Sequence, residues 1–149
     1  MRKLDISDSI GTLIFLASKS IERAAEHEIK QKLGLTPSQW KVILALNMSD
    51  GLSQKELADK IYVDTSTLVP IIDKMEKNGL LERKPDLKDR RHNRLFLTKK
   101  AESTVDSIVE EIIQLRKLIY KGISKDEQES MRPHLKNMID NAEKILDKH

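Results

Sequence analysis

The chain has 149 residues, of which 34% are charged and only 3% aromatic, and its formal net charge is +3. It contains no cysteine, which excludes disulfide bonds, thiolate metal sites and cysteine redox sensing. With so few aromatic residues the core must be mainly aliphatic, a composition that favours a single, mainly α domain over a β-sandwich.

The first predicted element is a long amphipathic helix from about Asp8 to Lys32. Apolar residues recur in it at a spacing of three and four between Leu13 and Ala25. The stretch Ile10–Ala17 is broken by Gly11 and Thr12 and is too short to span a bilayer. Since no secretory signal is evident, we expect a cytoplasmic protein with no membrane partner.

Three further helices are predicted from their capping residues. Thr36-Pro37-Ser38-Gln39 begins a helix that carries Trp40 and ends near Met48. Ser53-Gln54-Lys55-Glu56 is a capping box that begins a short helix, and Asp64 or Thr65 caps another that ends near Asn78. Two helices joined by so tight a turn predict a helix-turn-helix, whose second helix reads base edges with its N-terminal residues.

A β-hairpin with a basic tip is predicted after these helices. Leu80–Lys84 and Asn93–Thr98 alternate apolar and polar residues, and the polar, turn-rich segment Pro85–His92 lies between them. Because an isolated hairpin is marginal in water, it must pack against the preceding helices.

Two helices are predicted to complete the chain. Thr98 caps the first, which ends at Gly122, and the Ser124–Glu127 capping box begins the second. Their apolar stripes fit either the core of one chain or the seam of a dimer. We favour the seam, because two long terminal helices have little else in a small chain to cover them.

The positive charge of the chain is concentrated in residues 73–100. This window holds ten basic and five acidic residues, a net +5, which leaves −2 for the rest of the chain. A local basic zone on a near-neutral body indicates a polyanion-binding surface, the alternative being a solvated charged face.

The predicted recognition helix and hairpin offer different DNA chemistry. The helix N-terminus supplies small hydroxyls and no Arg, Asn or Gln, so we expect modest direct base readout from it. At the hairpin tip, Arg90 or Arg91 could enter a narrow minor groove, with Asp89 holding the tip through the backbone or one of these arginines. Lys88, His92 and Arg94 would flank phosphates. Four phosphates per subunit would give a log–log salt slope near about −7 for a dimer.

These residues resemble the MarR family of winged helix-turn-helix regulators. The matching stretches are Leu35–Trp40, Leu52–Ala58, Asp64–Pro70, Met75–Arg83, Asp89–Arg91 and Leu95–Thr98. The resemblance covers nearly the whole chain, and the order of the stretches is more specific than any one of them.

The resemblance implies a homodimer formed by the first and last helices, which presents two recognition helices to a pseudo-palindromic DNA site. It implies a repressor or an activator, and we expect a repressor. In many relatives a small aromatic anion binds between the dimer region and the DNA-binding lobe and releases the DNA. The wing Asp and Arg of the family map onto Asp89 and Arg91.

Pro70 departs from the pattern of many relatives, which carry Arg or another polar residue there. It removes one helical N–H, a donor that could otherwise contact DNA. A peroxide-sensing subgroup also has this proline but senses through a cysteine in the first helix. This chain has no cysteine, so that sensing mechanism cannot apply.

The predicted organisation has an N-terminal dimerisation helix at residues 1–34, a winged helix-turn-helix lobe at 35–98 and C-terminal dimerisation helices at 99–149. The candidate DNA-binding residues are Ser53, Gln54, Asp64, Thr65, Ser66, Thr67, Val69, Pro70, Lys74, Lys88, Asp89, Arg90, Arg91 and Arg94. The candidate effector pocket is lined by Phe15, Lys19, Arg23, Trp40 and Ile43.

No catalytic, cofactor or metal site is predicted. The four histidines, His27, His92, His134 and His149, are scattered, and the sequence has no nucleophile elbow and no glycine-rich phosphate loop. An enzyme would need paired catalytic groups that the sequence does not offer. The main alternative to a DNA-binding regulator is a winged-helix module for protein–protein interaction.

Overall fold

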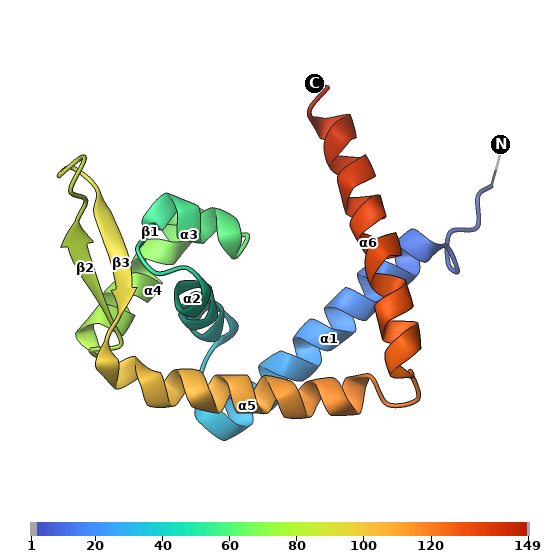
Figure 1. The fold of residues 1–149 in the computed structure, drawn as a ribbon, viewed down its shortest axis with the longest axis horizontal. Helices are drawn as coiled ribbons and strands as arrows, with labels where there is room; N and C mark the ends of the chain where they lie inside the picture. The colour runs from blue at the N-terminus through green and yellow to red at the C-terminus, as the bar shows by residue number, and fades with distance from the viewer. Residues whose placement is uncertain (1–2, 149) are drawn as a thin grey trace. The chain divides into compact units, whose positions relative to one another are not determined.

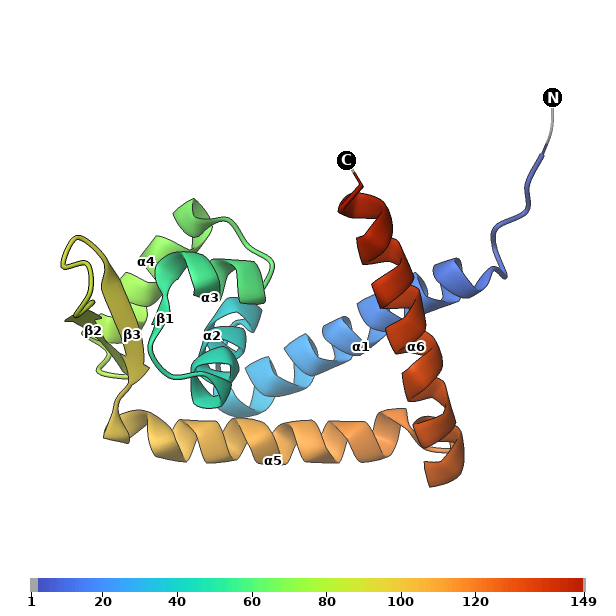
Figure 2. The same cartoon turned by 45° about the horizontal axis from the view of Figure 1, so that its top comes forward.

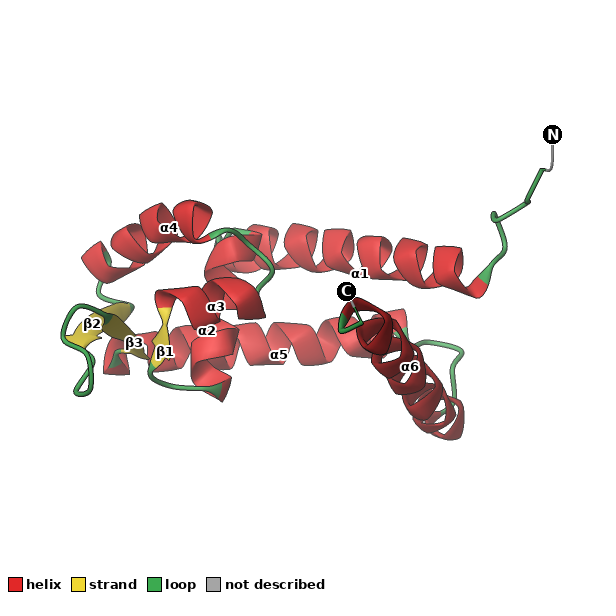
Figure 3. Ribbon diagram, turned by 90° about the horizontal axis from the view of Figure 1, so that it is seen from above, coloured by secondary structure: helices red, strands yellow, loops and turns green. Residues whose placement is uncertain are grey.

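The computed structural model describes residues 3–148, and it is mainly α with one small antiparallel sheet (Figures 1 and 3). The elements in chain order are α1 (Ile10–Leu33), α2 (Pro37–Met48), β1 (Leu52–Ser53), α3 (Gln54–Lys60), α4 (Thr65–Lys77), β2 (Leu81–Pro85), β3 (Asn93–Leu97), η1 (Lys99–Ala101), α5 (Glu102–Ile119) and α6 (Lys125–Leu146). The predicted fold class is confirmed. The chain divides into two compact units, residues 1–113 and 114–149. Within the described range, no helix combines the length and apolarity that crossing a bilayer requires.

The predicted capping boxes set where three of the helices begin. At the start of α2, α3 and α6, a Thr or Ser hydroxyl accepts the N–H of the residue three positions on, and that residue's side chain accepts the cap N–H. The three cap residues are Thr36, Ser53 and Ser124. Each box satisfies two backbone donors that an uncapped helix leaves unpaired.

Two helix starts differ from the sequence prediction. α1 begins at Ile10 and not near Asp8, because the Ser9 hydroxyl accepts the Thr12 N–H and caps the helix there. Thr98 was predicted to cap a continuous long helix, but it precedes the short 3₁₀ turn η1, and α5 begins only at Glu102. Asp64 occupies the cap position of α4, yet its side chain makes no capping hydrogen bond.

The sheet has three strands where the sequence predicted a two-stranded hairpin. β2 pairs with β3 in the register Leu81↔Leu97, and β1 adds to the other edge of β3 through Leu52↔Leu95. Figure 2 shows β1 beside β3 at the start of α3. The third strand therefore joins the hairpin to the helix-turn-helix, which supplies the support that an isolated hairpin lacks.

The core of the first unit fixes which face of α4 is buried. Leu68, Ile72 and Met75 are completely buried, and they pack in one cluster with side chains of α2, α3, α5 and the sheet. Their helical spacing directs the N-terminal turn of α4, Thr65–Thr67, to the surface.

Apolar side chains also remain uncovered in both units. In α1, Leu13, Phe15 and Leu16 are about half exposed, and the described part of α6 has no buried residue at all. Uncovered apolar faces of this kind are typical of interaction surfaces.

Candidate nucleic-acid interface

The N-terminal turn of α4 is exposed as a reading surface requires. Asp64, Thr65, Ser66 and Thr67 are all exposed, and Val69 is half-buried. Pro70 lies inside the helix on its exposed side, so it removes one backbone donor without breaking α4. This turn therefore offers hydroxyls, a methyl group and free backbone N–H groups to a nucleic acid.

The residues at the N-terminus of α3 form hydrogen bonds within the protein. The Ser53 hydroxyl accepts the Glu56 N–H at 3.1 Å, and the Gln54 side-chain oxygen accepts two long hydrogen bonds from Arg83, at 3.3 and 3.4 Å. Both residues are half-buried. Any DNA contact by Ser53 or Gln54 would therefore compete with a contact inside the protein.

Arg83 joins the sheet to the recognition helix. From β2 its guanidinium contacts Asp73 at 2.5 Å and Glu76 at 2.6 Å, both on α4. Burial alone would lower the pKa of Arg83, but the hydrogen bonds to Asp73 and Glu76 outweigh it and raise the pKa. The hairpin β2–β3 with its loop, residues 81–97, is called the wing below. The Arg83 guanidinium is paired with carboxylates of the protein itself and holds α4 against the wing.

The wing tip is organised by Asp89, as predicted. Its carboxylate accepts the Arg91 backbone N–H at 3.1 Å and the Arg91 guanidinium through Nε and Nη2, each at 3.0 Å. These bonds, the guanidinium first, lower the pKa of Asp89. The predicted geometry is confirmed, and Arg91 remains 87% exposed while its orientation is fixed.

Three other side chains of the tip differ in their exposure and ion pairing. Lys88 and Arg90 are exposed and form no ion pair within residues 3–148. His92 lies 3.6 Å from the Asp89 carboxylate. The tip therefore presents two free cations and one preorganised arginine.

Arg94 was predicted to flank phosphates, and in the structure its guanidinium is paired with groups of the protein itself. Its guanidinium forms ion pairs with Asp86 at 2.7 Å and Glu56 at 3.0 Å, and it donates to the Gly51 carbonyl at 3.2 Å. Neither partner, Asp86 nor Glu56, was predicted from the sequence. Asp86 carries a recognisable local signal, because an Asp at the start of a turn commonly accepts the N–H two residues on, here that of Lys88 at 2.8 Å.

The predicted effector residues do not converge on one described cavity. Ile43 is completely buried in the core, so in this conformation it cannot line a ligand pocket. Phe15 and Arg23 are exposed on α1, and Lys19 lies 6.0 Å from the Phe15 ring. Trp40 is half-buried, and its indole nitrogen is shielded from solvent without a hydrogen-bond partner.

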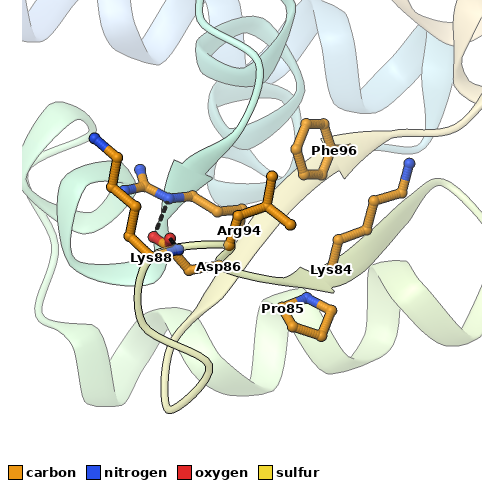
Figure 4. A pocket seen from close by; sticks show the side chains of 7 residues that line it. Lys84, Pro85, Asp86, Lys88, Arg94 and Phe96 are labelled. Atoms are coloured by element: carbon orange, nitrogen blue, oxygen red, sulfur yellow. Dashed lines mark hydrogen bonds and ion pairs between the residues drawn. The ribbon is translucent and has the colours of Figure 1, made fainter.

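Two cavities of the first unit lie elsewhere. One, of about 440 Å³, borders the wing between Lys84, Leu87, Arg94 and Phe96 (Figure 4). The other, of about 510 Å³, borders the turn between α3 and α4. Neither includes a predicted effector residue.

The histidines form no metal cluster in the described part of the chain. Within residues 3–148, no three His, Asp or Glu side chains gather as metal ligands, and His149 lies outside that range.

Comparisons with known proteins point to one family. The MarR family model matches residues 35–92. The HTH-type transcriptional regulator SarZ of Staphylococcus haemolyticus is 26% identical over 139 residues, which are 91% of this chain and 90% of SarZ. The crystal structure of the transcriptional regulator PA3341 has a TM-score of 0.81 at 30% identity, covering 90% of this chain and 98% of that one. BpsR of Bordetella bronchiseptica, whose DNA binding is regulated by 6-hydroxynicotinic acid, has a TM-score of 0.78 at 22% identity, covering 93% and 99%.

Proposed function

The chain belongs to the MarR family of transcriptional regulators, and we propose that it acts as a homodimeric repressor on a pseudo-palindromic site in duplex DNA. The observation that carries the proposal is the pairing of two exposed elements in one unit. The N-terminal turn of α4 is uncovered, and the neighbouring wing presents Lys88, Arg90 and the oriented Arg91. A winged helix-turn-helix uses such elements on the major groove and on the adjacent backbone or minor groove.

In this proposal α4 positions the protein in the major groove, and the wing contributes most of the affinity for DNA. Thr65, Ser66 and Thr67 reach phosphates or base edges with short side chains that cannot read a base pair bidentately. Arg91 meets the DNA with little loss of side-chain freedom, because Asp89 already holds it. Arg90 is free to follow the groove or the backbone.

The homodimer is supported by the uncovered apolar faces of the terminal helices. The exposed large apolar residues are Ile10, Leu13, Ile14, Phe15, Leu16 and Ile21 in α1, and Met131, Leu135, Met138, Ile139, Ile145 and Leu146 in α6. We assign residues 1–34 and 99–149 to dimerisation and residues 35–98 to DNA binding. A two-fold dimer presents two identical reading surfaces, which matches a pseudo-palindromic site.

A small aromatic anion is the proposed effector. Lys19 and Arg23 supply positive charge near the Phe15 side of α1, and the indole N–H of Trp40 lacks an acceptor. The relative BpsR responds to 6-hydroxynicotinic acid, which belongs to this chemical class. The proposed effector site does not include Ile43, because this side chain is completely buried in the core.

Random-site selection with the purified protein, followed by binding titrations at several salt concentrations, tests the proposed function. We expect selection of an A·T-rich pseudo-palindrome and a log–log salt slope of about −5 to −7, for three or four phosphates per subunit. No binding at low salt would overturn the proposal. The protein–protein alternative predicts that replacing Arg90 and Arg91 by Ala leaves function intact. DNA binding predicts a loss of about 1–3 kcal/mol for a groove-inserted arginine.

The direction of regulation needs its own measurement. A reporter gene placed behind the selected site should become more active when the protein is removed. Reduced activity would identify an activator and contradict repression.

A further inference from the structure

We infer that Arg94 is a positioning residue, which fixes the wing tip to the N-terminus of α3 and thereby sets where the DNA-contacting wing tip stands relative to the helix-turn-helix, without binding DNA itself. The inference rests on the proposed DNA-binding function. It assigns to Arg94 a role different from the phosphate contact that its place in a basic segment suggested.

On the wing side, Arg94 acts through Asp86. The Nε of Arg94 donates to Oδ2 of Asp86 at 2.7 Å, as the dashed line in Figure 4 shows. The other oxygen of Asp86 accepts the backbone N–H of Lys88 at 2.8 Å and that of Asp89 at 3.4 Å. The Asp86 side chain is only 13% exposed, so it is a fixed part of the loop. Arg94 therefore anchors the turn from which Lys88, Arg90 and the Asp89–Arg91 pair project.

On the helix side, Arg94 acts through Glu56. The Nη1 of Arg94 donates to Oε2 of Glu56 at 3.0 Å and to the Gly51 carbonyl at 3.2 Å. The same Glu56 oxygen accepts the Ser53 N–H at 2.8 Å and so completes the capping box of α3. One continuous chain of hydrogen bonds thus runs from the cap of α3 to the backbone of the wing tip.

The local charge balance argues against a direct phosphate contact by Arg94. One guanidinium faces two carboxylates, so the cluster Glu56–Asp86–Arg94 carries a net negative charge and does not attract a phosphate. Two donor groups of Arg94 are already used, and its side chain is 38% exposed. Lys88 and Arg90, in the loop before β3, are exposed and make no ion pair within the described range.

The geometry also explains why arginine stands at this position. Its planar fork spans two carboxylates and a carbonyl at fixed angles, whereas the single ammonium of lysine carries the same charge but cannot hold the same three groups in place. A direct phosphate contact would tolerate lysine, because it needs mainly a positive charge near the backbone. The two roles therefore predict opposite results for a conservative substitution.

DNA titrations over a range of salt concentrations separate these roles. We expect Arg94→Lys and Arg94→Gln both to weaken binding by roughly tenfold, with the salt slope of the wild type. Lys88→Gln is the matched control, since it removes one positive charge from the same hairpin, as Arg94→Gln does. It should make the slope shallower by about 2 for the two subunits. The inference is overturned if Arg94→Lys binds like the wild type, or if Arg94→Gln makes the slope shallower as Lys88→Gln does.

A second variant and a second readout guard against loss of folding. Asp86→Asn leaves Arg94 in place and removes a negative charge from the wing. A purely electrostatic interface would then bind DNA more tightly, whereas a positioning role predicts weaker binding. Without DNA, amide hydrogen exchange at Lys88 and Asp89 should become faster in Arg94→Lys while the helices keep their protection. Unchanged exchange there would contradict the inference.

The two hypotheses fail in different ways. If the wild-type protein binds no DNA at low salt, the proposed function fails and the inference fails with it. If the wild type binds and the Arg94 variants bind equally well, only the inference fails.

Discussion

Arg83→Met is expected to lower the free energy of unfolding by about 1–2 kcal/mol. The substitution keeps an unbranched apolar stem and removes the ion pairs to Asp73 and Glu76, at 2.5 and 2.6 Å. Exposed ion pairs contribute about 0.2–1 kcal/mol each to the free energy of unfolding. The upper half of this range applies here, because the Arg83 side chain is only 21% exposed. The two carboxylates are 59% and 41% exposed, so water can solvate them after the change. The larger penalty of an orphaned buried charge therefore does not arise.

Equilibrium unfolding in urea, at fixed protein concentration because a dimer is expected, measures this change. In thermal unfolding the midpoint should fall by about 3–7 °C. Lys88→Met is the control, since Lys88 makes no ion pair within residues 3–148, and it should change stability by no more than about 0.5 kcal/mol. A double-mutant cycle with Asp73→Asn should show a coupling of about 0.5–1 kcal/mol. If Arg83→Met costs less than about 0.3 kcal/mol, the ion pairs do not hold α4 to the sheet.

Three further predictions concern strain, pH and assembly. Tyr62 has a φ of +57° and is 95% exposed, so Tyr62→Gly should stabilise the protein by about 0.5 kcal/mol in urea unfolding, as relief of left-handed strain exceeds the entropy cost of glycine. A loss of more than about 1 kcal/mol would show that the ring matters to the fold. The pKa values of Asp86 and Asp89 are lowered, Asp86 mainly by the Lys88 N–H and Asp89 mainly by the Arg91 guanidinium. Their stabilising contribution is therefore complete above the unfolded-state pKa and lost as the pH falls below about 4, where the wing-tip amides should lose protection relative to their intrinsic exchange rates. Faster exchange on raising the pH from 5 to 7, beyond the intrinsic base catalysis, would contradict this sign. Leu16→Glu and Ile139→Glu should each shift the protein to a monomer in sedimentation velocity, and an unchanged dimer would exclude those faces from the seam.

Sequence reasoning worked best where a contact is local. The capping boxes at Ser53–Glu56 and Ser124–Glu127 join residues three positions apart, so the sequence itself contains both partners. The Asp89–Arg91 contact spans two residues and was predicted for the same reason. Such features depend on backbone geometry that a short segment adopts largely by itself.

Contacts between segments that are distant in the sequence could not be predicted in this way. β1 has only two residues, too few to show an alternating pattern, and it forms because Leu52 pairs with Leu95. Ile43 was named as a lining residue of the candidate effector pocket, yet the three-dimensional packing of α2 buries it completely. Burial depends on the whole fold, and the helical spacing of one segment cannot distinguish a core face from a pocket wall.

The basic segment, residues 73–100, shows the same limit of sequence-based prediction, and here a measured salt slope can test it. Counting cations in residues 73–100 gives no means of separating those that bind DNA from those that hold the lobe together. In the structure Arg83 and Arg94 form ion pairs within the lobe, whereas Lys88, Arg90 and Arg91 are exposed on the wing. Three phosphate contacts per subunit give a salt slope of about −5 for a dimer, and a fourth gives about −7. Lys74, exposed on α4 and without an ion pair in the described range, is the cation that could supply the fourth. The measured slope, together with that of Lys74→Gln, therefore decides whether α4 neutralises a phosphate or contributes only hydroxyls and backbone groups.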